Sequence, residues 1–183
     1  KGKHLAHSVG ESYIVSKKFV PKLWNAPSNL PHDWALLLLK EPLGQRIGYV
    51  GWQAFSSADL ADSVAKGANL MQVGYPQDRA HALSVASRCV VDASRPGDTL
   101  IRHNCLTIAG DSGGPLALLF GNRLSVVGIN NATVGGAENT HSTAVPLAPF
   151  ARSISELQKL DGSEKDGGGL PLRFGWTPPG SSG

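Results

Sequence analysis

Short apolar runs separated by turn-forming residues predict a chain that is mostly β. Residues 33–39 form the most continuous run, Asp-Trp-Ala-Leu-Leu-Leu-Leu, which ends at Glu41-Pro42. This run predicts a strand that is buried on both faces. A weaker β pattern covers residues 4–19, and a further strand is expected within residues 47–55. The segments between them are expected to be a loop and a connector, at residues 21–31 and 56–67.

The second half of the chain has a clearer β pattern. Leu83, Val85, Cys89 and Val91 fall on one face of a predicted strand, so Cys89 is expected to point toward the core. Gly121-Asn122 separates two apolar runs and predicts the two-residue turn of a β-hairpin. The strands predicted in this half cover residues 69–75, 83–91, 99–102, 116–120, 124–129 and 142–147.

The period of the pattern changes near the C-terminus. Phe150, Ile154, Leu157 and Leu160 recur at helical spacing and predict one amphipathic helix that ends near Asp161-Gly162. Residues 162–183 are rich in Gly, Pro and Ser and predict a disordered tail.

Composition and charge exclude several classes of protein. The 183 residues are 41% hydrophobic and 17% charged, which argues against disorder over most of the chain. A net charge of +3, without a basic cluster among aromatic residues, predicts no nucleic-acid partner. The longest apolar run, residues 34–39, is far shorter than the roughly 20 residues of a membrane span. No signal peptide is recognised, and because the chain opens at Lys1 we expect a mature or truncated product.

Cys89 and Cys105 are the only cysteines, and they fit either one disulfide or two buried thiols. Their spacing matches no zinc site, and no other metal or cofactor is implied. We favour the disulfide, which would close a loop and stabilise the fold by roughly 3 kcal/mol. A disulfide predicts an oxidising compartment, so the protein is expected to be secreted or periplasmic.

The candidate chemistry lies in Gly110-Asp111-Ser112-Gly113-Gly114-Pro115. A serine hydroxyl is a weak nucleophile that needs a base to accept its proton and donors to stabilise the oxyanion. A glycine-rich turn exposes the hydroxyl and directs backbone N–H groups at the developing charge. The alternative is an ordinary glycine-rich loop.

This segment resembles the serine motif of the trypsin/chymotrypsin family. Cys105 and Gly128-Ile129-Asn130 are similar to the bacterial secreted branch that includes glutamyl endopeptidases. The resemblance, from about Asp33 to Leu160, implies a chymotrypsin-like double antiparallel β-barrel with a C-terminal α-helix and the active site between the barrels. The implied domains are 1–67, the remainder of an incomplete N-terminal barrel with the connector; 68–161, the C-terminal barrel with the helix; and 162–183, the tail.

The family implies a role for each motif residue. Ser112 would be the nucleophile of a serine endopeptidase, and the N–H groups of Gly110 and Ser112 would form the oxyanion hole. Asp33 would orient the catalytic histidine, although it could also simply cap a loop. In some relatives, the aspartate at the position of Asp111 pairs with a freed N-terminus. A local hydrogen bond within the loop is at least as good an interpretation of Asp111.

The resemblance also suggests which residues line the substrate pocket. Thr107 and Asn130 stand where glutamyl endopeptidases place a threonine and a histidine, so Asn130 puts selectivity for glutamate in doubt. Leu106 stands where trypsin-like enzymes carry an acidic group, which argues against a preference for Lys or Arg. We expect a polar, uncharged pocket, unless Thr107 and Asn130 are ordinary loop residues.

The catalytic histidine is not evident. The family order is His, Asp, Ser, with Ala-Ala-His-Cys well before the aspartate, and no such motif precedes Asp33. His7 lies in a similar context but too close to Asp33, and His32 would project to the opposite side of an extended backbone. We expect the histidine upstream of Lys1, which would make the isolated chain poorly stable and inactive. The other histidines are expected on the surface or in loops: His81, His103 and His141.

Rival interpretations remain. Residues 110–114 also satisfy Gly-x-Ser-x-Gly of α/β-hydrolases, but that motif requires a strand before it and a helix after it, whereas Pro115 and a predicted hairpin follow here. A protease homologue without catalysis could serve as a binding module, and a structural β-domain is a third possibility. The favoured partner is a protein or peptide substrate, with no nucleic acid or membrane, and the chain is expected to be a monomer.

Overall fold

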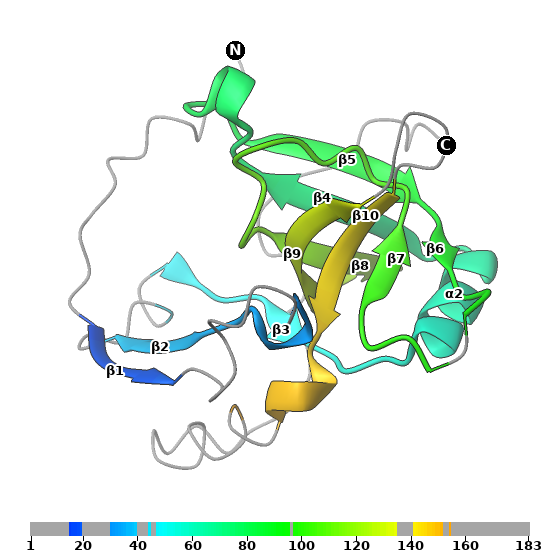
Figure 1. Cartoon of the computed structure of the whole chain (residues 1–183), viewed down its shortest axis with the longest axis horizontal. Coiled ribbons are helices and arrows are strands. Elements are labelled where there is room, and N and C mark those ends of the chain that lie inside the picture. Colours follow the sequence, from blue (N-terminus) through cyan, green and yellow to red (C-terminus); the bar gives the residue numbers. More distant parts are fainter. Residues whose placement is uncertain are drawn as a thin grey trace.

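The computed structural model describes residues 15–19, 30–39, 44, 47–95, 97–134, 141–151 and 154. Within them the fold is mostly β, as predicted, and consists of a two-stranded sheet and a curled eight-stranded sheet (Figure 1). The large sheet has the order β5-β4-β8-β9-β10-β7-β6, and β3 pairs with β9 beside this path. The predicted tail, residues 162–183, lies outside the described residues.

The strands of the second half form nearly where the sequence predicts them. Most neighbours in the large sheet are antiparallel, and the exception is the parallel pair of β3 with β9. The strands are β1 (Val15–Phe19), β2 (Leu36–Leu39), β3 (Gly51–Trp52), β4 (Asn69–Gly74), β5 (Ser84–Cys89), β6 (Val91–Asp92), β7 (Ile101–His103), β8 (Pro115–Phe120), β9 (Arg123–Val134) and β10 (His141–Pro146). The described helices are η2 (Leu30–His32), α2 (Ser57–Ala65), η3 (Gln77–Arg79) and η4 (Ala148–Phe150).

The β8–β9 hairpin is the centre of the large sheet and confirms the predicted turn. Phe120 pairs with Arg123, so Gly121 and Asn122 form the two-residue connection. Gly121 has a positive φ of 60°, which glycine adopts without strain. The core packs against this hairpin and its neighbours. Its largest fully buried apolar side chains are Leu60, Leu70, Ile101, Leu116, Val127, Val145 and Leu147.

The predicted face of the strand around Cys89 is wrong at its N-terminal end. Leu83 and Val85 are 43% and 45% exposed, whereas Cys89 is buried. The cause is a bulge: Leu70 pairs with Cys89 and Met71 with Ser87, which leaves Arg88 between them without a partner residue. Arg88 has a φ of 60°, so the alternation of side chains slips by one position at this point.

Helix α2 lies in the segment for which the sequence predicts only a connector, so the structure corrects this expectation. Ser56 caps it: its Oγ accepts a hydrogen bond from the Asp59 backbone N–H at 3.1 Å. Leu60 is fully buried by the helix, with Ala61 and Val64 packed against the same core. No helix within the described residues is long and apolar enough to cross a lipid bilayer.

The first half contributes a small sheet of β1 and β2, seen in blue beside the large sheet in Figure 1. The prediction that residues 33–39 form a strand buried on both faces is wrong for Leu37, which lies on β2 and is 55% exposed. The two-stranded sheet forms a single layer. Among the described residues, no second layer covers Leu37. The strand expected within residues 47–55 is reduced to β3.

The chain after β10 turns into a helical segment at the position predicted. The 3₁₀ helix η4 ends at Phe150, and Ala151 and Ile154 are helical. Ile154 packs against Val145 and Leu147, which places the start of the predicted C-terminal helix on the core. The rest of that helix lies outside the described residues.

Candidate active site

Ser112 lies on an exposed turn between β7 and β8. The turn is tied to the neighbouring strand β9 by two backbone hydrogen bonds, from Gly113 N to Asn130 O at 2.7 Å and from Asn130 N to Gly114 O at 2.9 Å. A third, from Gly114 N to Asp111 O at 3.0 Å, closes the turn itself. The sheet therefore holds the turn rigidly while the Ser112 side chain remains open to solvent.

Two N–H groups of this turn have no hydrogen-bond acceptor among the described residues. Within the described part of the chain, neither the N–H of Gly110 nor that of Ser112 has a hydrogen-bond acceptor, whereas Asp111, Gly113 and Gly114 all donate to backbone oxygens. These are the two groups predicted to form the oxyanion hole. Only glycine fits at position 110, because its φ is 98° and a β-carbon would lie 2.7 Å from the backbone N of Gln77.

Asp111 points away from solvent, into the base of the turn. It is 3% exposed, and its Oδ2 accepts a hydrogen bond from the Ile108 backbone N–H at 3.0 Å. This is the local loop hydrogen bond that the sequence allowed. Asp111 thus braces the residues on both sides of the predicted oxyanion hole.

Asp33 is brought toward Ser112 by Asn131. The carbonyl of Leu30 accepts hydrogen bonds from the Asp33 N–H and from the Asn131 side-chain Nδ2, both at 3.1 Å. On its other side, the Asn131 carbonyl accepts a hydrogen bond from Ser112 Oγ at 3.1 Å. Asn131 therefore connects the segment that carries Asp33 with the turn that carries Ser112. Asp33 itself is exposed.

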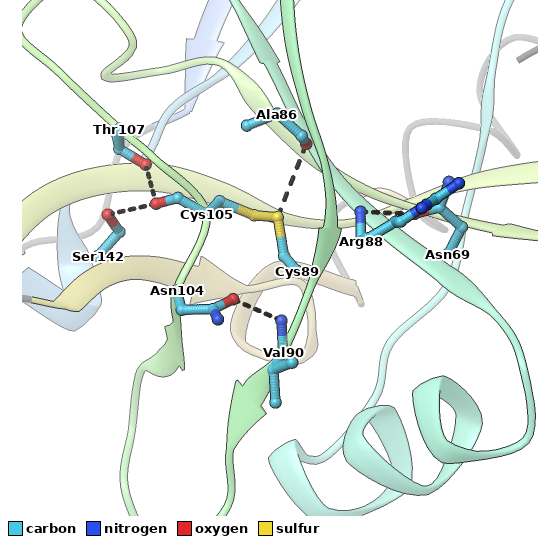
Figure 2. The surroundings of a disulfide bond; sticks show 9 residues. All are labelled: Asn69, Ala86, Arg88, Cys89, Val90, Asn104, Cys105, Thr107 and Ser142. Atoms are coloured by element: carbon cyan, nitrogen blue, oxygen red, sulfur yellow. Dashed lines mark hydrogen bonds between the residues drawn. A yellow bond between two sulfur atoms is a disulfide. The ribbon is translucent and has the colours of Figure 1, made fainter. Parts of the chain in front are cut away.

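Cys89 and Cys105 form the predicted disulfide, with their Cα atoms 5.0 Å apart (Figure 2). The carbonyl of Cys105 accepts hydrogen bonds from Ser142 Oγ at 3.1 Å and from Thr107 Oγ1 at 3.3 Å. The disulfide thereby anchors Cys105, at the start of the segment that leads to the Ser112 turn.

The family model described as Trypsin matches residues 2–154, which is most of the chain. The chain belongs to the trypsin family. A solved structure titled as a Glu endopeptidase in complex with MPD is 21% identical, with a TM-score of 0.61 over 86% of this chain and 69% of that one. The protease Anisep from Arthrobacter nicotinovorans is 17% identical, with a TM-score of 0.56 over 78% of this chain and 67% of that one. No curated protein sequence matches.

These similarities place the described sheets in a chymotrypsin-like fold, in agreement with the expectation from the sequence. Family members use a catalytic histidine, and among the described residues no histidine is hydrogen-bonded to Ser112 Oγ. The Ser112 hydroxyl bonds to a backbone carbonyl rather than to an imidazole. His7, the alternative base within the chain, lies outside the described residues.

His103 is buried in β7, which corrects its expected place on the surface or in a loop. The side chain is 1% exposed, and burial lowers its pKa to about 4. The neighbouring Asn130 amide offsets part of this shift in pKa, while the charge of His141 adds to it. His81 is exposed and His141 is half-buried on β10. His103 is thus a neutral core residue of this trypsin-family chain at neutral pH.

The residues predicted to line the substrate pocket occupy different environments. Thr107 is half-buried and its carbonyl accepts a hydrogen bond from Thr133 Oγ1 at 3.5 Å. Asn130 is 1% exposed on β9, and neither polar atom of its side chain has a hydrogen bond of good geometry within the described residues. Leu106 is 73% exposed. Among the described residues no cluster of three or more His, Cys, Asp or Glu could hold a metal ion.

Sequence reasoning missed Asn131. The resemblance of Gly128-Ile129-Asn130 predicts a pocket role for Asn130, one position earlier on the same strand. Thr143 pairs with Ala132 and Ala144 with Asn130, so Asn131 lies in a bulge without a partner residue on β10, and its backbone carbonyl reaches Ser112. The Thr143 hydroxyl donates a hydrogen bond to Asn131 Oδ1 at 2.8 Å and so orients the Asn131 amide.

Proposed function

We propose that this trypsin-family chain is the nucleophile-bearing part of a serine endopeptidase. Ser112 attacks the carbonyl of a peptide bond, and the N–H groups of Gly110 and Ser112 stabilise the oxyanion of the tetrahedral intermediate. The observation that carries this proposal is an exposed serine hydroxyl on a turn whose two flanking N–H groups have no acceptor among the described residues.

The proton of Ser112 is transferred to a histidine that lies outside the described residues, and our expectation remains that it lies upstream of Lys1. That histidine then protonates the leaving amine, and water hydrolyses the acyl-enzyme on Ser112 with the same base. Asp33 orients the histidine and stabilises its charged form. The shared hydrogen bonds at Leu30 support this role, because they hold the Asp33 segment against the strand beside Ser112.

The substrate is a protein or peptide, bound in a polar, uncharged pocket. Of the two predicted lining residues, Thr107 is half-buried and can contact a substrate, whereas the side chain of Asn130 is 1% exposed. The protein works outside the cytoplasm, since the Cys89–Cys105 disulfide persists in an oxidising compartment. We expect the isolated chain to be inactive toward peptides.

A second candidate function is a binding module without catalysis. One observation favours it: Ser112 Oγ donates to the Asn131 carbonyl, so the hydroxyl is held by backbone rather than by a base within the described residues. In that case the turn would present a recognition surface and Asp33 would only cap η2.

The two candidates are separated by labelling with a fluorophosphonate, which reacts with an activated serine. The chain should be prepared as printed and also joined to the residues encoded before Lys1. We expect the longer chain to be labelled at Ser112 and to hydrolyse peptides. Ser112→Ala should reduce kcat by about 10⁶-fold, and Asp33→Asn by about 10⁴-fold.

The printed chain should react slowly. After the rate with imidazole alone is subtracted, added imidazole should increase its hydrolysis of an activated ester but not that of Ser112→Ala. His7→Ala should change neither length. If both lengths fold and neither is labelled at Ser112, the endopeptidase proposal is wrong and the binding module is favoured.

A further inference from the structure

Two buried polar atoms beneath the Ser112 turn have no partner among the described residues. They are Nε2 of Gln72, on β4, and Oδ1 of Asp111, the residue before the nucleophile. Each side chain is 3% exposed. A buried donor or acceptor that lacks a hydrogen bond is costly, and a buried carboxylate most of all.

The two atoms meet at the same point of the fold, over Gly74. A side-chain β-carbon at position 74 would lie within 3.0 Å of both Asp111 Oδ1 and Gln72 Nε2. Gln72 and Gly74 are two residues apart on β4, so they share one face of that strand. One atom is a donor and the other an acceptor, both lie within 3.0 Å of the same point, and each belongs to a terminal group whose torsion is soft.

We propose that Gln72 is a positioning residue for the Ser112 turn, whose side-chain amide donates to Asp111 Oδ1. Asp111 is then satisfied at both oxygens, since Oδ2 already accepts from Ile108 N–H. The turn is held in its reactive shape by a neutral side chain from the same barrel, with no need for a cationic partner such as a freed N-terminal amine. The inference deepens the proposed function and rests on it for its catalytic consequence.

Gly74 is what makes the pairing possible. Because a β-carbon at this position would clash with both side chains, Gly74 lets both of them approach the strand. The φ of Gly74 is not positive, so the requirement for glycine comes from the close approach and not from backbone strain.

Asp111 transmits any loss of this contact to the site. Its N–H donates to Ile108 O at 3.1 Å, and its carbonyl accepts from Gly114 N. A carboxylate that turned toward solvent to find water would pull both bonds and move the N–H groups of Gly110 and Ser112. We therefore expect Gln72 to act on kcat rather than on KM.

A double-mutant cycle measured by urea unfolding tests the contact without relying on catalysis. Gln72→Met keeps the length of the side chain and removes the donor. It should raise the unfolding equilibrium constant by about 10- to 100-fold, and by much less in an Asp111→Ala background. Gln53→Met, at an exposed glutamine on the same chain, is the matched control and should have little effect. Additive effects of the two substitutions would refute the contact.

Hydrogen exchange on the unmodified chain covers the case in which a variant fails to fold. The side-chain amide protons of Gln72 should exchange at least about 100-fold more slowly than those of Gln53, because hydrogen-bonded buried groups exchange only on opening. Equal exchange rates would contradict the proposal.

Activity supplies the remaining readout, in whichever length hydrolyses peptides. Gln72→Met should lower kcat by about 10-fold or more with KM nearly unchanged, and blocking the N-terminal amine should leave kcat unchanged. If blocking the amine abolishes activity and Gln72→Met does not, a cation is the partner of Asp111 and the proposal is wrong. A chain that folds but never hydrolyses would refute the proposed function, while the unfolding cycle would still decide the contact.

Discussion

Burial of His103 makes the stability of this fold sensitive to acid. The pKa of His103 falls from an ordinary value of 6.5 to about 4, chiefly because desolvation disfavours the charged ring. Between these two pH values the unfolded chain binds a proton at this residue and the native chain does not. The free energy of unfolding must therefore fall as the pH is lowered from about 6.5 to about 4.

The magnitude follows from the size of the shift in pKa. Each pKa unit corresponds to about 1.4 kcal/mol, so the loss contributed by His103 is about 2 kcal/mol at pH 5 and about 3 kcal/mol at pH 4. No discount for solvent screening applies, since the side chain is 1% exposed. Against a typical domain stability of about 5–15 kcal/mol, a loss of this size is readily measured.

The assay is urea unfolding of the chain and of His103→Leu at pH 7, 5 and 4. Carboxylates add their own acid sensitivity to both proteins, so the quantity of interest is the difference between them. We expect His103→Leu to lose about 2–3 kcal/mol less than the unmodified chain between pH 7 and pH 4. His81→Leu, at an exposed histidine, is the control and should follow the unmodified chain. If His103→Leu is as acid-sensitive as the unmodified chain, the reasoning fails.

Two further predictions concern the bonds that support the site. Asn131→Asp keeps an acceptor for Thr143 but loses the donor to Leu30 O, so the Asp33 segment should loosen and kcat/KM should fall by about 10- to 100-fold; an unchanged kcat/KM would argue against Asn131 as the connection. Reduction of Cys89–Cys105, which closes a loop with a sequence separation of 16, should lower the free energy of unfolding by about 3 kcal/mol. Reduced and oxidised chains with the same urea midpoint would contradict this.

The parts of the fold that were predicted correctly depend on neighbours in sequence. The β8–β9 hairpin follows from Gly121-Asn122 between two apolar runs, and the Ser112 turn from its glycines, because turn chemistry is decided within a few residues. Helix α2 carried a comparable local signal, Ser56 followed three residues later by Asp59, and should have been recognised as capped. The short helix was missed because it has only one fully buried position, Leu60.

The errors have a different physical origin. Arg88 adopts a left-handed conformation in a bulge, and nothing in an arginine side chain signals that, so the pattern of Leu83 and Val85 was assigned to the wrong face. His103 was expected outside because a histidine carries a polar ring. Only the register of β7 between β10 and β6 shows that position 103 faces the core.

The same distinction, between features set by neighbours in sequence and features set by strand assembly, applies to the candidate site. Ser112, Gly110 and Asp111 belong to one continuous turn, so their chemistry could be inferred from a single motif. Asn131 and Gln72 reach that turn from β9 and β4, and their contributions appear only when the strands are assembled. Each supplies a contact that the motif alone does not specify. Asn131 connects the aspartate segment to the nucleophile, and Gln72 lies near Oδ1 of Asp111. Because both are neutral amides, neither contact requires a charged partner from a distant part of the chain, whereas the core responds to pH through His103.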